Sequence, residues 1–347
     1  MTAPEEHVPQ PADAAAMIEV YYEKGWTDGL PVVPPSEDSV GAMLAGAGLQ
    51  GEDVVGEIAA RHTRITADKV AINAVLAGCL PEYMPVVVAA VKGICHEDYG
   101  YHGPSTSTGG AAVAMVVNGP IAARLGINGE DNVFGPGFRP NATIGRAVRL
   151  LMMNAINTRP GKLDKSTLGN PGKYTLCFAE NEANSPWEPL HVERGFKAED
   201  SAVTVFATEG SIQVYNQLSN DAETLCKTMA DAMANLGSIN IVGQQNIMAV
   251  WAGEHAAVFR KAGWSKKQVQ QCLFENAKRT VADIKRVGKF PLPIKPEDEE
   301  TYRHVTRTPE EILVLHAGAP QGAFSTCLPG WGSHSVTRAV TTRIETL

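Results

Sequence analysis

Apolar residues recur at helical spacing through much of the first half of the chain. This spacing predicts helices over residues 12–24, 36–45, 67–77, 82–94 and 142–156. Ser36, Thr66 and Asn141 stand where helix caps are expected, and Pro81 falls in a first-turn position, where its missing N–H costs nothing. Short apolar runs predict strands at 112–117 and 173–178.

From about residue 200 the pattern changes to strands that alternate with helices. Strands are expected at 203–207, 247–251 and 312–316, and helices at 222–236, 254–261 and 266–278, the last capped by Ser265. This alternation predicts an α/β fold, with a helical N-terminal portion and a mixed or parallel sheet covered by helices. We expect three segments: a disordered tail (1–11), a helix-rich α/β part with glycine-rich loops (12–199), and a second α/β part (200–347).

The composition is that of an ordinary globular protein, with 44% hydrophobic and 20% charged residues among 347. The net charge of −8, without any Lys- and Arg-rich block, argues against nucleic-acid binding, which needs clustered cations. The N-terminus has neither the basic nor the apolar region of a signal peptide, and no apolar run is long enough to span a bilayer. A cytoplasmic protein without a membrane partner is therefore expected.

Six cysteines are scattered along the chain without any C-x-x-C pair. This spacing predicts neither a local zinc knuckle nor a disulfide framework, so most of them are expected to be buried free thiols. Cys327 is the one cysteine that we take as a candidate reactive thiol, because it lies in the same glycine-rich C-terminal stretch as His334.

The segment 177–194, CFAENEANSPWEPLHVER, holds the densest group of ionisable residues. We take Glu180, Glu182 and His191 as catalytic candidates, because a carboxylate beside an imidazole suits acid–base work. Glu182, Glu188 and His191 are also the candidates for a divalent metal, although their spacing matches no metal signature. A structural salt-bridge network through Arg194 and a solvated acidic loop are the alternatives.

Two glycine-rich loops supply further candidates. The loop 99–110 carries His102 as a catalytic candidate and the hydroxyl residues Ser105, Thr106 and Ser107 as substrate contacts. The loop 135–146 leads into a helix and carries Arg139 and Arg146, which could hold an anionic group or pair with the acidic segment.

Five stretches, in this order along the chain, resemble a little-characterised bacterial family related to the UGSC (seleno)proteins: GWTDGLPVVPP (25–35), KVAINAVLAGC (69–79), NATIGRA (141–147), STLGNPGKYTLCFAENE (166–182) and SPWEPLHVERGF (185–196). That group is named for a Cys/Sec-Gly-Ser-Cys motif, which this chain lacks; Gly332-Ser333-His334 comes nearest to it. The resemblance implies a bacterial enzyme that works with a smaller thiol- or selenol-bearing subunit. It supplies no catalytic residues.

The leading hypothesis is an enzyme that cleaves a bond in a small anionic organic substrate by Glu/His acid–base chemistry, as a lyase or hydrolase does. One alternative is the large subunit of a thiol- or selenol-dependent oxidoreductase with a small Cys- or Sec-bearing partner. Another is a binding protein without catalysis. A homo-oligomer or a hetero-oligomer is expected, and a divalent metal is the only cofactor considered.

Overall fold

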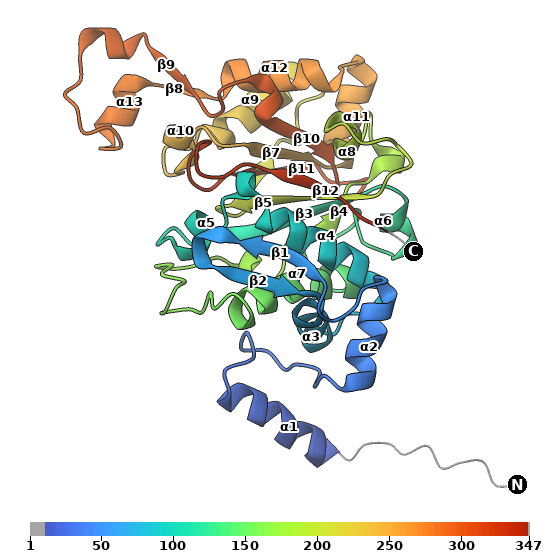
Figure 1. The fold of residues 1–347 in the computed structure, drawn as a ribbon. Coiled ribbons are helices and arrows are strands. Elements are labelled where there is room, and N and C mark those ends of the chain that lie inside the picture. The colour runs from blue at the N-terminus through green and yellow to red at the C-terminus, as the bar shows by residue number, and fades with distance from the viewer. Residues whose placement is uncertain (1–10, 346–347) are drawn as a thin grey trace, which may run out of the picture.

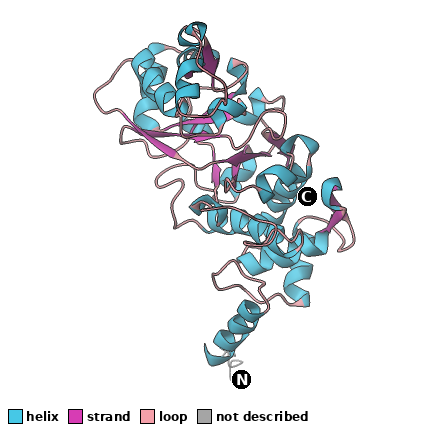
Figure 2. Cartoon of the chain, turned by 90° about the vertical axis from the view of Figure 1, so that its left-hand side faces the viewer, coloured by secondary structure: helices cyan, strands magenta, loops and turns pink. Residues whose placement is uncertain are grey.

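The computed structural model describes residues 11–345 and shows four layers, in which two sheets lie face to face between two layers of helices (Figure 1). The side view likewise shows the central strands with helices above and below them (Figure 2). The α/β class expected from the sequence is confirmed. The expected N-terminal tail lies outside the described residues, apart from Pro11, which begins α1.

The first sheet has the order β12-β5-β3-β4. Its strands are β3 (Ala112–Asn118), β4 (Cys177–Ala179), β5 (Ala202–Thr208) and β12 (Val340–Arg343). β3 and β4 are parallel, whereas β5 runs antiparallel to both β3 and β12. The long connection from β3 to β4 carries two helices, as parallel pairing requires.

The second sheet has the order β10-β7-β11-β6. Its strands are β6 (Ile212–Tyr215), β7 (Ile247–Trp251), β10 (Ile312–His316) and β11 (Phe324–Pro329). β7 and β10 are parallel, and β11 runs antiparallel to β7 and β6. Both sheets therefore share one plan: a parallel pair, then two strands added antiparallel.

The two sheets exchange strands along the chain. β6 follows β5 in sequence but joins the second sheet, and β12 follows β11 but joins the first. Strands from both sides of the expected division at residue 200 therefore form the first sheet, with β3 and β4 before it and β5 and β12 after it.

Helices cover the outer face of each sheet. The first sheet packs against α4 (Met84–Cys95) and α7 (Arg139–Asn154), and α2 (Glu37–Gly46) and α3 (Ala67–Ala77) pack on these helices in turn. The second sheet packs against α9 (Ala222–Met233), α11 (Gly253–Ala262) and α12 (Lys266–Asn276). A third apolar cluster joins the inner faces, with Val116, Phe178 and Phe206 from one sheet and Val250 and Leu315 from the other. Strand alternation explains this division, because successive side chains point to opposite faces.

The remaining elements are short or peripheral. They are α1 (Pro11–Glu23), α5 (His102–Thr106), α6 (Pro120–Arg124), α8 (Leu190–Glu193), α10 (Asn240–Gly243), α13 (Val281–Arg286), the hairpin β1 (Val54–Ile58)–β2 (Thr63–Thr66), and the pair β8 (Lys278–Thr280)–β9 (Tyr302–His304). Helix α1 and the β8–α13–β9 region project from opposite ends of the molecule (Figure 1).

Several predicted elements differ from the structure. The helix expected at 142–156 begins at Arg139, and Asn141 does not cap it, because its side chain bonds the backbone N–H and C=O of Asn128. The strand expected at 173–178 shortens to β4, because Pro171 starts a 3₁₀ turn that Asn170 caps. Ser36 and Ser265 do cap their helices, each in a capping box.

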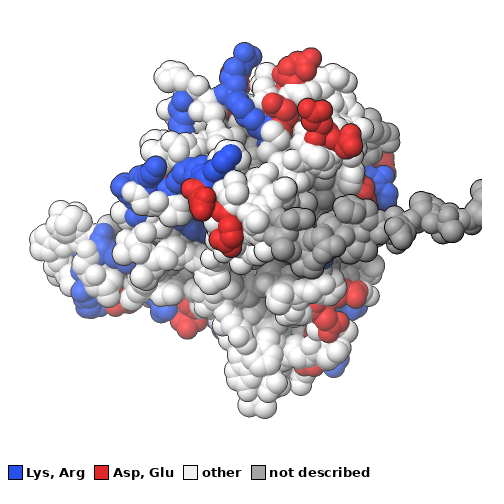
Figure 3. Space-filling model, turned by 90° about the horizontal axis from the view of Figure 1, so that it is seen from below, with Lys and Arg blue, Asp and Glu red and all other residues white. Residues whose placement is uncertain are grey.

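Across residues 11–345, none of the helices combines the length and apolarity needed to cross a bilayer. The face seen from below carries several groups of acidic and basic side chains, some of them side by side, among uncharged ones (Figure 3).

We predict that Phe178→Ala lowers the free energy of unfolding by about 3–5 kcal/mol, because it opens a cavity between the two sheets. Phe178 is 0% exposed and meets Phe134 edge-to-face at 4.9 Å. Urea unfolding followed by circular dichroism measures the change. Leu168→Ala is the control, since Leu168 is 95% exposed and its loss should change stability by less than about 0.5 kcal/mol. Equal stability of the two variants would contradict the packing described.

Candidate active site

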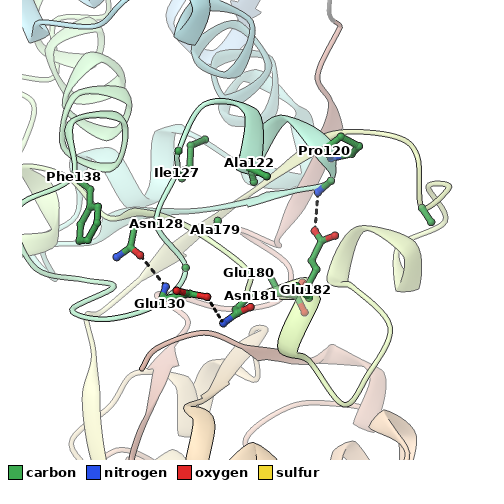
Figure 4. A pocket seen from close by; sticks show the side chains of 16 residues that line it. Pro120, Ala122, Ile127, Asn128, Glu130, Phe138, Ala179, Glu180, Asn181 and Glu182 are labelled. Atoms are coloured by element: carbon green, nitrogen blue, oxygen red, sulfur yellow. Dashed lines mark hydrogen bonds between the residues drawn. The ribbon is translucent and has the colours of Figure 1, made fainter. Parts of the chain in front are cut away.

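A cavity of about 590 Å³ opens at the carboxyl ends of the parallel strands β3 and β4. It is bounded by Pro120 and Ala122 of α6, by the loop 126–130, by Phe138, and by residues 179–183 after β4 (Figure 4). The size is that of a small-molecule site. Its position is the one where α/β sheets bind ligands, since the turns that follow parallel strands meet at one edge.

Asn118 ends β3 and is completely buried. It faces the same side of the sheet as Ala114 and Val116, because it lies an even number of residues along the strand. Gly119 follows with φ of +83°, and a Cβ at that position would lie 2.1 Å from the carbonyl oxygen of Asp200. Only glycine fits there, and the turn brings its N–H against Glu182.

Glu180 follows β4 directly and is only 4% exposed. Its Oε2 accepts hydrogen bonds from Asn118 Nδ2 at 2.7 Å and from the Leu190 N–H at 2.8 Å, whereas Oε1 has no partner within the described chain. Burial raises the pKa of Glu180 to about 7, against the opposing effects of Lys266 and of these two hydrogen bonds. A carboxyl group of this kind exchanges a proton near neutral pH.

Glu182 lies at the start of a 3₁₀ turn and is the more exposed of the two carboxylates. Its Oε1 accepts hydrogen bonds from Asn118 Nδ2 at 2.9 Å and from the Gly119 N–H at 2.7 Å, and Figure 4 draws the second of these. One amide nitrogen thus binds both carboxylates. The two are neighbours because of this bridge, since β4 ends at Ala179, before either glutamate.

His191 lies on α8 and is completely buried. Its Nδ1 is 3.9 Å from Glu182 Oε1, which is too long for a hydrogen bond, and neither ring nitrogen has a partner among the described residues. Arg194 bonds Thr341 and the carbonyl oxygen of Ala339, so it does not tie the two glutamates into a salt-bridge network.

The two expected anion-binding arginines do not line this cavity. Arg139 donates two hydrogen bonds to the carbonyl oxygen of Gly78. Arg146 forms a bidentate ion pair with Asp28, with both hydrogen bonds at 2.8 Å. This pair fixes the loop that contains Asp28 against α7. Both side chains therefore bind the protein's own groups.

The His102 loop also lies away from the cavity. Residues 102–106 form α5, where Ser105 is buried and accepts a hydrogen bond from Arg61 at 2.6 Å. Thr106 bonds back to the carbonyl oxygen of His102, and Ser107 accepts from the N–H of Gly109. The contacts of Thr106 and Ser107 are therefore local ones of a short helix and a turn, and Ser105 binds a structural arginine.

Among the metal candidates, Glu182 and His191 lie 3.9 Å apart, but Glu188 does not line the cavity. Glu188 is exposed, and within residues 11–345 no three His, Cys, Asp or Glu side chains are grouped so that they could hold a metal ion. Cys327 is buried in the apolar layer beneath α9, where burial raises its pKa to about 12. His334 pairs instead with Glu311, at 2.9 Å.

Sequence reasoning missed Asn118, Asn128, Glu130 and Asn181. Asn128 accepts from the N–H of Glu130 at 2.9 Å, and Asn181 donates to Glu130, so these three line the cavity wall opposite α6 (Figure 4). One signal was present for Asn118, namely a polar residue directly after a buried strand and before Gly-Pro.

Comparisons with protein-family models, with curated proteins and with solved structures found no match to this chain.

We predict that Glu180 makes stability fall as the pH rises through neutrality. In the unfolded chain this group ionises near 4.5, whereas in the folded protein its pKa is about 7. The contribution of Glu180 to the free energy of unfolding is therefore complete below about pH 4.5 and is lost as the pH rises through 7. The loss is on the order of 3 kcal/mol.

Urea unfolding of wild type and Glu180→Gln between pH 4 and pH 9, roughly the range over which a carboxyl of this kind titrates, measures the difference. The variant should lack this loss, while Glu199→Gln at an exposed position should follow wild type. Parallel curves for wild type and Glu180→Gln would contradict the burial argument.

Proposed function

We propose that this protein is an enzyme that cleaves a bond in a small polar molecule by acid–base catalysis, in the manner of a lyase or a hydrolase. The proposal rests on the surroundings of the Glu180 carboxyl group and on their effect on its pKa. This carboxyl is buried beside an open cavity, its Oε1 has no partner among the described residues, and its pKa is raised to about 7. Shifted groups in clefts are typical of acid–base residues.

Glu180 acts as the proton-transfer group. In its ionised form it takes a proton from the substrate or from an attacking water, and in its protonated form it returns that proton to the leaving group. Oε2 is held by Asn118 and Leu190, so the unpartnered Oε1 is the atom that exchanges the proton.

Glu182 and Asn118 position the site. The N–H of Gly119 and the amide of Asn118 fix the Glu182 carboxylate, and the same amide orients Glu180. Glu182 then offers a negative charge at a fixed place beside the reacting atoms, where it stabilises positive charge that develops on the substrate. The ring of His191 lies next to Glu182 and is the third ionisable group here, with Glu180 and Glu182.

The cavity favours a neutral or cationic substrate. Its lining includes Glu130, Glu180 and Glu182 but neither lysine nor arginine. A carboxylate or phosphate would meet like charges there without a compensating cation. The proposal therefore keeps the acid–base chemistry expected from the sequence and replaces the anionic substrate, because Arg139 and Arg146 bind elsewhere.

The proposal is tested by screening the protein for activity on small molecules and by comparing wild type with a variant of Glu180. Purified protein is incubated with a panel of small neutral, cationic and anionic amides, alcohols and amines, and substrate loss is followed by NMR. We expect turnover of a neutral or cationic compound. Glu180→Gln should lower kcat by about 100- to 10,000-fold, the range for loss of a general acid–base group.

Glu188→Gln is the matched control, because Glu188 is exposed in the same segment and does not line the cavity. It should keep the wild-type rate. Equal rates for wild type and a folded Glu180→Gln would rule out the proposed role.

A further inference from the structure

A cavity of about 530 Å³ lies between helix α7 and the loop that leads from α7 to β4. Its lining comes from Arg149 and Met153 on α7, from the loop over residues 160–174, and from Asp28 nearer the N-terminus. It shares no lining residue with the cavity at Glu180. We call it the basic cavity, after the cations of this loop.

The loop is basic in a protein that is acidic overall. Residues 159–173, RPGKLDKSTLGNPGK, contain four cationic side chains and one carboxylate, a balance of +3, whereas the whole chain has a net charge of −8. The cations are Arg159, Lys162, Lys165 and Lys173, and the acid is Asp164. A local excess of positive charge of this kind attracts anions.

Inside the cavity two cations share one carboxylate. Asp164 is 5% exposed, and it accepts hydrogen bonds from Lys173 Nζ at 2.8 and 3.0 Å and from Arg149 Nη2 at 2.9 Å. Burial acts to raise the pKa of Asp164, but hydrogen bonds, first those from Lys173 and Ser166, outweigh it and hold that pKa below its ordinary value. Asp164 is therefore ionised, and the three charged groups together keep one positive charge.

The remaining charges at this place do not cancel that excess. Asp28 also lines the cavity, but it is neutralised by the bidentate ion pair with Arg146. Burial lowers the pKa of Lys173, yet both oxygens of Asp164 accept its hydrogen bonds, so Lys173 keeps its proton. A positive charge that is partly removed from water and left uncompensated favours the binding of an anion.

Arg149 has hydrogen-bond donors that the protein does not use. Its side chain is 11% exposed, and among the described residues only its Nη2 has a partner, Asp164. Its Nε and Nη1 are not shut away from solvent. Of the two openings that Arg149 lines, the smaller, of about 10 Å³, holds one water molecule at most. The basic cavity is therefore the space in which a ligand can accept from these N–H groups, and carboxylates and phosphates are the acceptors that a guanidinium binds best.

Apolar side chains border the same cavity. Leu168 and Tyr174 are 95% and 49% exposed, and Met153 and Pro171 belong to the lining with them. Large apolar side chains left in water beside a cavity gain stability when a ligand covers them. They indicate a ligand that has an apolar part next to its anionic group.

We propose that the basic cavity binds a small organic anion that carries a carboxylate or phosphate group next to an apolar part. The anionic group accepts hydrogen bonds from Arg149 beside the Lys173 ammonium, and the apolar part lies against Leu168 and Tyr174. The volume is that of a small-molecule site. This ligand is opposite in charge to the substrate favoured by the cavity at Glu180, and the inference does not rest on the function proposed there.

The experiment titrates the full-length protein with phenyl phosphate and with benzoate, followed by isothermal titration calorimetry in a buffer free of phosphates and carboxylates. Benzamide, which has the same ring without the charge, is the control ligand. We expect saturable binding of at least one of the two anions and no binding of benzamide at the same concentrations. The anion that binds more tightly identifies the group that the site takes.

Arg149→Gln removes the unused N–H groups, while Lys173 can still pair with Asp164. It should weaken binding of the anion by about 10- to 100-fold, the effect of losing hydrogen bonds to a charged group. Lys165→Gln is the matched control, because it removes one positive charge from the same loop at a residue that does not line the cavity. It should change the affinity by less than about threefold, since exposed charges are screened.

Leu168→Ala tests the apolar contact at little risk to the fold, because this side chain is 95% exposed. It should weaken binding of the aromatic anion by about three- to tenfold. Glu180→Gln should bind the anion as wild type does, which separates this site from the acid–base function of the other cavity.

No binding of either anion, equal binding of benzamide, or unchanged binding in folded Arg149→Gln would each overturn the proposal. In those cases the contacts of Asp164 with Arg149 and Lys173 only fasten the loop to α7. Where Arg149→Gln does not fold, Leu168→Ala locates the site, and full affinity of that variant for the aromatic anion would overturn the proposal as well.

Discussion

The site depends on the enclosure of one carboxyl group, that of Glu180, at the point where two parallel strands end between two sheets. Burial disfavours the charged form of a carboxylate, and here it outweighs two hydrogen bonds and the attraction of Lys266. The parallel register of β3 and β4 sets Glu180 beside Asn118, whose amide also binds Glu182. Without that register, neither glutamate would have its partner.

The four-layer arrangement explains why such a group can be buried at all. The apolar cluster between the sheets excludes water behind Glu180, and α8 closes over it with the N–H of Leu190. In front, the cavity leaves Glu182 accessible. The same layering places a second cavity at the other parallel pair, where alanines stand at the positions of the acidic groups. The two cavities therefore have similar places in their sheets but different linings.

Much of the fold follows from local patterns in the sequence. Strands β7 and β10 have the bounds predicted, and the capping boxes at Ser36 and Ser265 begin helices as expected, because these signals lie within a few neighbouring residues. The strand exchange was not predictable, since β6 and β12 are short and their partners lie far away in sequence. Pairing over such distances leaves no local periodicity.

The site was predicted in part. A dense group of carboxylates identified Glu180 and Glu182 as candidates, and the structure places both at a cavity. Arg139 and Arg146 were candidates because a glycine-rich loop carries them into a helix and their charge complements that of the acidic segment, but Gly78 and Asp28 bind them instead. Asn118 was passed over because an asparagine before Gly-Pro is typical of a turn. The role of Asn118 depends on the pairing of β3 with β4, in which Val117 lies beside Ala179, about sixty residues further along the chain.

The most direct test of the central claim is a titration of Glu180 itself. Carbon-13 NMR of protein labelled at the glutamate carboxyl carbons, with the signal assigned by its loss in Glu180→Gln, would follow this group across the pH range. We expect one buried glutamate that titrates near pH 7, far above the ordinary value of 4.5. A Glu180 signal that titrates near its ordinary value would contradict the account, because the group would then be ionised at neutral pH and could not donate a proton.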